Sequence, residues 1–362
     1  MSTIKVLHVI ARMNVGGAAK YVGDLVENVP NSELATGFVQ GSELEDSITD
    51  ELILHRIPHL GRKISVVNDI RAWRELRLVI QELQPDVVHT HTFKAGFVGR
   101  LVGGNHKRVH TFHGHLFDDL SFSQVEKMVI TIVERYLAKK TDILISVGDR
   151  VGQDLRAAGI GANREWVSIS PGVTRLPIVD KIRARDALKL DRDAFLVGWM
   201  GRMTSVKNPF LALEVAKRMP EVQFVFAGGG DLLQRVRENA PKNVEVIGWV
   251  DASKFWSAVD CAISTSDNEG MPIALIEAQL AGIPVIATNV GSISEIIEDG
   301  ITGFVTQKGV DGLSIGLLAM ISNSNLLRSM SVAAPKFAES KFGLLKMLEA
   351  HLSIYAKLVR NT

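Results

Sequence analysis

The sequence contains a single cysteine, Cys261, among its 362 residues. One cysteine cannot form an internal disulfide, so the hydrophobic core must hold the fold together, and a reducing compartment fits this composition. Cys261 lies in an apolar run, and we interpret it as a core residue. The sequence also lacks an 18-residue apolar run and a signal-peptide layout. It therefore predicts no transmembrane helix and a cytoplasmic location.

An excess of charge of one sign is missing too. The 41 basic and 40 acidic residues leave a net charge of +1. The whole chain therefore has no general attraction to nucleic acid or to an anionic membrane, and any such attraction must be local. With 46% hydrophobic and 22% charged residues, the chain has the composition of a globular protein with an ample core. Its length favours two domains.

Strand-like apolar segments alternate with helix-like segments along the chain. In the first half, strands are predicted at residues 4–10, 86–89, 108–112 and 143–146. Alternation at this pitch indicates a parallel sheet with helices on both faces, and ligands of such sheets collect at the carboxyl ends of the strands. Prolines and charged residues predict a linker over residues 173–189. We therefore predict two doubly wound α/β domains, at residues 1–172 and 190–342.

The first strand is not followed by the G-x-G-x-x-G pattern of dinucleotide-binding proteins. Gly16 and Gly17 instead connect this strand to the next helix, and glycines there let the backbone approach a phosphate. No acidic residue follows a second strand at the spacing expected for a dinucleotide ribose. A dehydrogenase is therefore disfavoured, and a tight turn without a ligand remains the alternative for the two glycines.

Residues 264–297 are the most informative stretch, with the pattern strand, loop, helix, strand, helix. Pro272 is predicted at the first helical position and Gly282 as the left-handed cap. Glu269 lies just before this helix and Glu277 lies within it. A helix N-terminus suits a phosphate, and a carboxylate accepts hydrogen bonds from sugar hydroxyls. The combination indicates a nucleotide sugar as the ligand.

The run E-G-M-P-I-A-L-I-E-A from Glu269, with A-G-I-P-V-I-A-T and V-G-S-I-S-E-I-I after it, resembles the signature of retaining family 4 glycosyltransferases. The resemblance covers nearly the whole chain and is most specific over residues 195–305. It implies the GT-B fold, in which two Rossmann-like domains face each other across a cleft. It also implies that a C-terminal helix, at about residues 343–362, crosses back to the first domain.

The same resemblance implies an enzyme of class EC 2.4, a hexosyltransferase that moves a sugar from a UDP or GDP sugar to an acceptor hydroxyl with retained configuration. Glu269 and His113 are implied as catalytic residues, and Glu277 as a ligand of the ribose. Diphosphate ligands are implied at Gly16, Gly17, Arg202 and Lys207. Backbone N–H groups that reach the sugar are implied at Gly270, Met271 and Ile273.

Two predicted strand ends carry histidine pairs, His89 with His91 and His113 with His115. Four imidazoles can bind a metal, but no cluster of cysteine or carboxylate residues supports this alternative. We therefore expect no metal and no cofactor. In the resembled family the position of His113 lies near the donor sugar and its phosphate. His91 and Lys94, in the run H-x-x-K-A-G, resemble a loop of bacterial polysaccharide enzymes, which places them on the acceptor side.

The predicted helix at residues 68–83 carries Arg71, Arg74 and Arg77 opposite an apolar stripe, with Arg62 and Lys63 just before it. A basic amphipathic helix can lie on an anionic membrane, although such a face is more often simply solvated. An apolar stretch, Phe117, Leu120 and Phe122, can likewise meet a lipid or pack internally. We therefore expect a lipid-linked saccharide acceptor at the inner membrane face, in surface polysaccharide assembly, and no nucleic-acid partner.

Two other functions remain open at this stage. A nucleotide-sugar epimerase of the same fold would use its carboxylates as bases and would need no acceptor, so product analysis without acceptor distinguishes it. A non-catalytic protein that binds nucleotide sugars would show no turnover. The full set of implied site residues argues against the second alternative, and the acceptor-side loop argues against the first.

Overall fold

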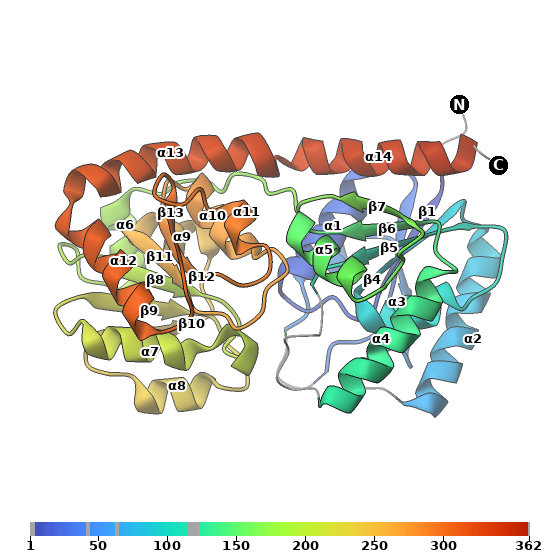
Figure 1. Ribbon diagram of the computed structural model, residues 1–362, viewed down its shortest axis with the longest axis horizontal. Coiled ribbons are helices and arrows are strands. Elements are labelled where there is room, and N and C mark those ends of the chain that lie inside the picture. The colour runs from blue at the N-terminus through green and yellow to red at the C-terminus, as the bar shows by residue number, and fades with distance from the viewer. Residues whose placement is uncertain (1–3, 41–43, 62–64, 115–122, 361–362) are drawn as a thin grey trace. The chain divides into compact units, whose positions relative to one another are not determined.

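The computed structural model describes residues 4–40, 44–61, 65–114 and 123–360 (Figure 1). The chain divides into two compact units. The first unit combines Met1–Gly172 with Leu344–Thr362, and the second is Val173–Gly343. Several residues considered above lie outside the described ranges, namely Arg62, Lys63, His115, Phe117, Leu120 and Phe122.

The first unit contains a parallel seven-stranded sheet with the order β3-β2-β1-β4-β5-β6-β7. Its strands are β1 (Val6–Ile10), β2 (Ser32–Thr36), β3 (Leu54–Arg56), β4 (Val87–His91), β5 (Lys107–Phe112), β6 (Ile143–Ser146) and β7 (Glu165–Ser168). The strand order reverses between β1 and β4. In doubly wound sheets ligands bind at the carboxyl ends of the strands beside such a reversal.

Helices complete the first unit, because strands that are buried on both faces need cover on both. They are α1 (Gly17–Asn28), η1 (Ser47–Asp50), α2 (Val66–Leu83), α3 (Thr92–Arg100), α4 (Gln124–Ala138), α5 (Asp149–Ala157) and α14 (Leu344–Arg360). The C-terminal helix α14 packs against α1, near the other end of the sequence (Figure 1). The prediction that the last helix returns to the first domain is therefore confirmed.

The second unit contains a parallel six-stranded sheet with the order β10-β9-β8-β11-β12-β13. Its strands are β8 (Leu196–Met200), β9 (Gln223–Ala227), β10 (Val244–Gly248), β11 (Cys261–Ser264), β12 (Val285–Thr288) and β13 (Gly303–Thr306). Its helices are α6 (Lys181–Leu188), η2 (Ser205–Lys207), α7 (Pro209–Arg218), α8 (Leu233–Asn239), α9 (Ala252–Ala258), α10 (Ile273–Leu280), α11 (Ile293–Ile296), α12 (Val310–Ser322) and α13 (Ser324–Phe342). The order reverses between β8 and β11.

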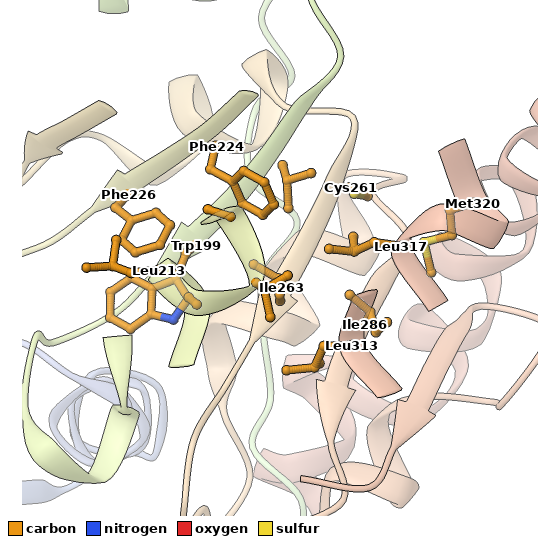
Figure 2. Close-up of a cluster of buried hydrophobic side chains, with 14 of the residues drawn as sticks. Trp199, Leu213, Phe224, Phe226, Cys261, Ile263, Ile286, Leu313, Leu317 and Met320 are labelled. Atoms are coloured by element: carbon orange, nitrogen blue, oxygen red, sulfur yellow. The ribbon is translucent and has the colours of Figure 1, made fainter. Parts of the chain in front are cut away.

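A buried hydrophobic cluster joins this sheet to α7 and α12 (Figure 2). Trp199 from β8 stacks on Phe226 from β9 with ring centroids 5.5 Å apart. Cys261 is fully buried in the same cluster, as its apolar flanks predict. Burial raises the pKa of its thiol, so Cys261 is a core residue and not a nucleophile.

The predicted linker over residues 173–189 is wrong in one respect, because it contains helix α6 and belongs to the second unit. Asp180 caps α6 by accepting a hydrogen bond from the Arg183 N–H. The buried guanidinium of Arg185 donates to Asp260 Oδ2 at 2.8 Å and to four backbone carbonyls. These charges are structural, although in the sequence they resemble a solvated connection.

No single helix within the described ranges is long and apolar enough to cross a membrane. Helices α12 and α13 meet the length and composition criteria only as a pair, and the chain bends by 101° where they join.

Candidate active site

Lys207 is held at the carboxyl edge of the second sheet by the loop that follows β8. Asn208, with φ of +46°, accepts a hydrogen bond from the Leu211 N–H and caps α7, whose first residue is Pro209. Asparagine directly before proline is a sequence pattern typical of such a cap. Thr265, just after β11, donates from its hydroxyl to the Asn208 carbonyl at 2.9 Å. The Lys207 loop is thereby attached to the strand that leads to Glu269.

Glu269 is buried and receives two contacts on the same carboxylate oxygen. Lys207 Nζ lies 2.5 Å from Glu269 Oε1, and the Ser266 hydroxyl donates to that oxygen, also at 2.5 Å. Within the described ranges, Oε2 accepts no hydrogen bond. The ion pair and the Ser266 hydroxyl therefore hold the Glu269 carboxylate in one orientation, with its second oxygen available to a hydroxyl donor.

The backbone between Glu269 and α10 is fixed from the next helix. The Ser292 N–H donates to the Gly270 carbonyl at 3.1 Å. Gly291 has φ of +50°, and a Cβ there would lie 1.7 Å from the Glu269 carbonyl oxygen, so only glycine fits. No side chain caps α10. Its first N–H groups are therefore oriented toward the Glu269 loop and can bind an anion.

The boundaries of α10 differ slightly from the prediction. Pro272 is the N-cap, with φ of −73° and ψ of 110°, and the helix begins at Ile273. The C-terminal prediction is confirmed, since Gly282 has φ of +79° directly after the last turn. Glu277 is half-buried on α10, and Arg202 is half-buried in the loop after β8. Both belong to the same unit as the Lys207–Glu269 pair.

In the first unit, the N-terminus of α1 lies at the carboxyl end of β1. Gly16 is the N-cap and Gly17 is the first, exposed helical residue, with no side-chain cap. The two glycines thus leave backbone N–H groups uncovered beside the position where the strand order reverses. An uncapped helix start at this edge of a parallel sheet is suited to a phosphate.

A chain of three histidine rings crosses the same sheet edge. His8 on β1 is joined to His91 by a hydrogen bond of 3.1 Å between Nδ1 and Nε2. His91 at the end of β4 is joined to His113 by a second bond of 3.1 Å, between Nδ1 and Nε2. His8 and His91 are fully buried, whereas His113, directly after β5, is partly exposed. His113 is therefore the outer end of the chain.

Helix α14 and helix α1 pack around these rings. The Tyr21 hydroxyl lies 3.1 Å from His351 Nε2, and the Tyr21 ring meets His113 edge-on with centroids 4.9 Å apart. Tyr355 binds His89 Nδ1 at 2.7 Å. The sequence reasoning missed His8, Tyr21 and His351. A histidine between Leu7 and Val9 in a buried strand was the available signal, because a buried polar ring requires a partner.

Two family models match the chain, and they cover both units. The glycosyl transferase 4-like domain matches residues 16–171, and the glycosyl transferases group 1 model matches residues 180–337. The chain is a family 4 glycosyltransferase. It is accordingly an enzyme of class EC 2.4, and the residues from Glu269 to Ile297 lie within the group 1 match.

Several characterised proteins are similar to this glycosyltransferase along their whole length. An Escherichia coli UDP-Gal:α-D-GlcNAc-diphosphoundecaprenol α-1,3-galactosyltransferase is 26% identical, with 99% of this chain and 98% of the relative covered. HepE of Anabaena in complex with UDP and glucose has a TM-score of 0.84 at 18% identity, with 98% of this chain and 100% of HepE covered. Sucrose-phosphate synthase of Thermosynechococcus elongatus has a TM-score of 0.87 at 17% identity, covering 99% and 100%. These structures show the GT-B fold.

The two residues predicted on the acceptor side of the glycosyltransferase are covered by other side chains. His91 is fully buried beneath His113, and Lys94 is 5% exposed and pairs with the buried Asp69. Neither side chain lines the surface of the first unit in this structure. Their role toward an acceptor stays a prediction.

Three ring nitrogens, one each from His8, His89 and His91, lie within 4.8 Å of one another, as metal ligands would. Hydrogen bonds account for this approach. His89 binds the Tyr355 hydroxyl through Nδ1 and the Thr111 hydroxyl through Nε2, each at 2.7 Å. His8 and His91 are bonded to each other through His8 Nδ1 and His91 Nε2. Among the described residues, every nitrogen of these three rings except His8 Nε2 therefore has a hydrogen-bond partner. Metal independence stays a prediction.

A separate cavity of about 660 Å³ lies at the opposite, amino-terminal edge of the first sheet. Trp73, Asp86 and Lys107 are among the residues that line it. It contains none of the predicted site residues.

Proposed function

We propose that this enzyme transfers a hexose from a UDP-hexose to a hydroxyl of a lipid-linked saccharide, with retained anomeric configuration, at the cytoplasmic face of the membrane. The observation that carries the proposal is the fixed Lys207–Glu269–Ser266 arrangement before the uncapped N-terminus of α10. The similarity to a galactosyltransferase named for a diphosphoundecaprenol acceptor supports the acceptor class. The similarity to a structure that holds UDP and glucose supports the donor class.

The main chemical demand of this reaction is to stabilise charge. The diphosphate gains negative charge as it leaves, while the anomeric carbon becomes cationic. Arg202, Lys207 and the helix N-termini supply fixed positive charge for the leaving group. Glu269 Oε2 accepts a hydrogen bond from a donor-sugar hydroxyl, and Glu277 binds the ribose hydroxyls. Gly270, Met271 and Ile273 present backbone to the sugar, whereas Pro272 has no N–H.

The proposal is tested by turnover with defined substrates. The enzyme is incubated with UDP-hexoses and a prenyl-diphosphate sugar, and the product linkage is read by NMR. We expect a new α linkage from an α-linked donor. An isomerised donor in reactions without acceptor would instead favour the epimerase. Donor binding that shifts the melting temperature, without product, would favour a non-catalytic protein.

We expect transfer to be independent of metal. Lys207, Arg202 and the α10 N-terminus already provide positive charge for the diphosphate, and both ring nitrogens of His89 and of His91 have hydrogen-bond partners within the protein. Activity in EDTA should equal activity in the untreated enzyme. Loss of activity in EDTA that is restored by manganese or magnesium would contradict this expectation.

We also propose a peripheral membrane contact through the first unit. Arg71, Arg74 and Arg77 are exposed on α2. On α4, one face carries exposed apolar side chains, between 50% and 65% accessible, at Val125, Met128, Val129, Ile132 and Tyr136. Their spacing places them in one stripe, and Lys139 and Lys140 follow it directly. An apolar stripe next to cations is suited to an anionic lipid surface.

Vesicle sedimentation tests this contact. Changing Arg71, Arg74 and Arg77 to Gln should weaken binding to anionic vesicles, since each charge contributes about 1 kcal/mol near such a surface. The same loss should follow from V129Q with I132Q if α4 inserts. The matched control changes the exposed Arg183, Lys189 and Lys242 of the second unit to Gln. Equal sedimentation of all variants would exclude the contact.

A further inference from the structure

His113, the outer member of the hydrogen-bonded row His8–His91–His113, is a neutral ring at physiological pH. Burial, with a smaller contribution from nearby His351, lowers the pKa of His8 and of His113 to about 3. A neutral imidazole carries one N–H and one lone pair. Whether His113 donates or accepts a hydrogen bond at the sheet edge therefore depends only on which ring nitrogen holds its proton.

The hydrogen bonds of the chain couple the proton positions of all three rings. Each contact joins one nitrogen that donates to one that accepts. If His8 holds its proton on Nδ1, it donates to His91 Nε2. His91 then donates from Nδ1 to His113 Nε2, and His113 must hold its proton on Nδ1. If His8 holds its proton on Nε2, every bond reverses.

His8, the inner ring of this row, decides between the two directions of hydrogen-bond donation. His8 Nε2 is buried and has no hydrogen-bond partner within the described ranges. A buried N–H without a partner is rarer in proteins than a buried acceptor without one. The favoured state therefore leaves the lone pair on His8 Nε2 and the proton on Nδ1. The donation then runs outward, from His8 through His91 to His113.

The ring plane of His113 is fixed by a second route. The Met347 carbonyl can only accept, so His351 Nδ1 donates to it at 2.8 Å and His351 Nε2 is an acceptor. Tyr21 therefore donates its hydroxyl proton to His351 Nε2. This bond holds the Tyr21 ring edge-on to His113, with an interplanar angle of 89°. His113 is thus constrained both in its tautomer and in its orientation.

We propose that His8 is a positioning residue that, through His91, fixes the Nδ1–H tautomer of His113, so that His113 presents a neutral N–H donor at the carboxyl edge of the first sheet. A donor there suits a phosphate or hydroxyl oxygen of the substrate, and this use rests on the proposed function. A neutral donor gives the charge of the leaving diphosphate a hydrogen bond without a proton transfer. His8 itself, in the interior of β1, does not touch substrate.

NMR of protein labelled with ¹⁵N in its imidazoles tests the proposal without substrate. In the wild type we expect the His113 Nδ1 resonance in the protonated range and Nε2 in the unprotonated range. His8→Phe removes the inner donor, and His113 should then lose its single tautomer. His8→Asn places an amide N–H near the former Nδ1–H and should restore it. The wild-type spectrum alone decides the direction of donation, even if a variant does not fold.

Kinetics supply the functional part of the test. His8→Phe should lower kcat about tenfold, which corresponds to about 1.4 kcal/mol of barrier, with the donor KM changed less than about twofold. His8→Asn should recover most of the loss. A wild-type His113 with its proton on Nε2, or one stoichiometric zinc ion in the purified protein, would overturn the proposal. The expected tautomer without transfer to any acceptor would instead contradict the proposed function.

Discussion

Glu269→Gln is expected to lower kcat about 100-fold, the effect of removing one preorganised charge-stabilising group from an active site. The substitution keeps the shape of the side chain and removes its charge. Lys207 then loses its ion pair, and the sugar hydroxyl loses an anionic acceptor as the ring gains positive charge. Steady-state kinetics with the donor varied and the acceptor saturating measure this effect.

Glu277→Gln is the matched control, because it makes the same chemical change within α10, the helix that follows the Glu269 loop. The proposed ribose contact of Glu277 is remote from the bond that breaks. We expect the donor KM to rise while kcat changes little, since ground-state and transition-state binding are lost equally. A loss mainly of kcat in Glu277→Gln, with a loss mainly of KM in Glu269→Gln, would reverse the two roles. Changes below about twofold in both would leave the stretch with a structural role alone.

Acidification from pH 7 to pH 5 is expected to destabilise the first unit and spare the second. All ten histidines of the chain lie in the first unit. Burial lowers the pKa of His8 and His113 to about 3 and that of His351 to about 4. The unfolded chain, with a histidine pKa of about 6.5, therefore binds more protons than the folded unit between these values. The contribution of these histidines to the free energy of unfolding is fully present above pH 6.5 and is lost as the pH decreases toward 4.

The expected loss is large. Each of the three histidines contributes about 1.4 kcal/mol per pH unit below about 6.5, so together they remove about 6 kcal/mol by pH 5. That is comparable with the entire stability of many domains. Burial also lowers the pKa of His89, His91 and His110, which increases the effect.

Hydrogen exchange read by mass spectrometry separates the two units. At pH 5, after correction for the intrinsic exchange rate, peptides from β1, β4 and β5 should lose protection while those from β8 and β11 keep it. His351→Asn removes one of these histidines, so the pH dependence of the unfolding free energy of the first unit should decrease by about one bound proton. His55→Asn is the control, because His55 lies outside the buried network. Equal protection of the first unit at both pH values would refute the linkage.

The parts that the sequence predicts correctly depend on local chemistry. Asn208 before Pro209 is a cap at any helix start, and Gly282 followed by Pro284 ends a helix in most contexts. The alternation of strand and helix segments likewise predicts the two parallel sheets. Glu269 stands out because its loop, helix and following strand form one continuous pattern.

The parts that the sequence does not specify depend on distant partners. Tyr21 and His351 are separated by 330 positions, and His89 and Tyr355 by 266. No local pattern announces that the last helix contributes to a hydrogen-bond network under the first strand. The same holds for Arg185, whose Asp260 partner lies 75 residues away and converts an expected linker into a helix of the second unit. Lys94 is likewise buried because it pairs with Asp69, a partner from another helix that the local sequence does not indicate.

The position of α14 gives the two units different routes to completion during synthesis. The second unit is continuous from Val173 to Gly343, whereas the first is interrupted by it and ends only with Leu344–Thr362. Domains usually fold as units, from the N-terminus first. Here the unit that is translated first must wait for α14 to leave the ribosome before Tyr355 and His351 can reach His89 and Tyr21. The nascent first sheet therefore carries His89 and Tyr21 without these partners until α14 has been made, and the second unit can complete its fold before the first.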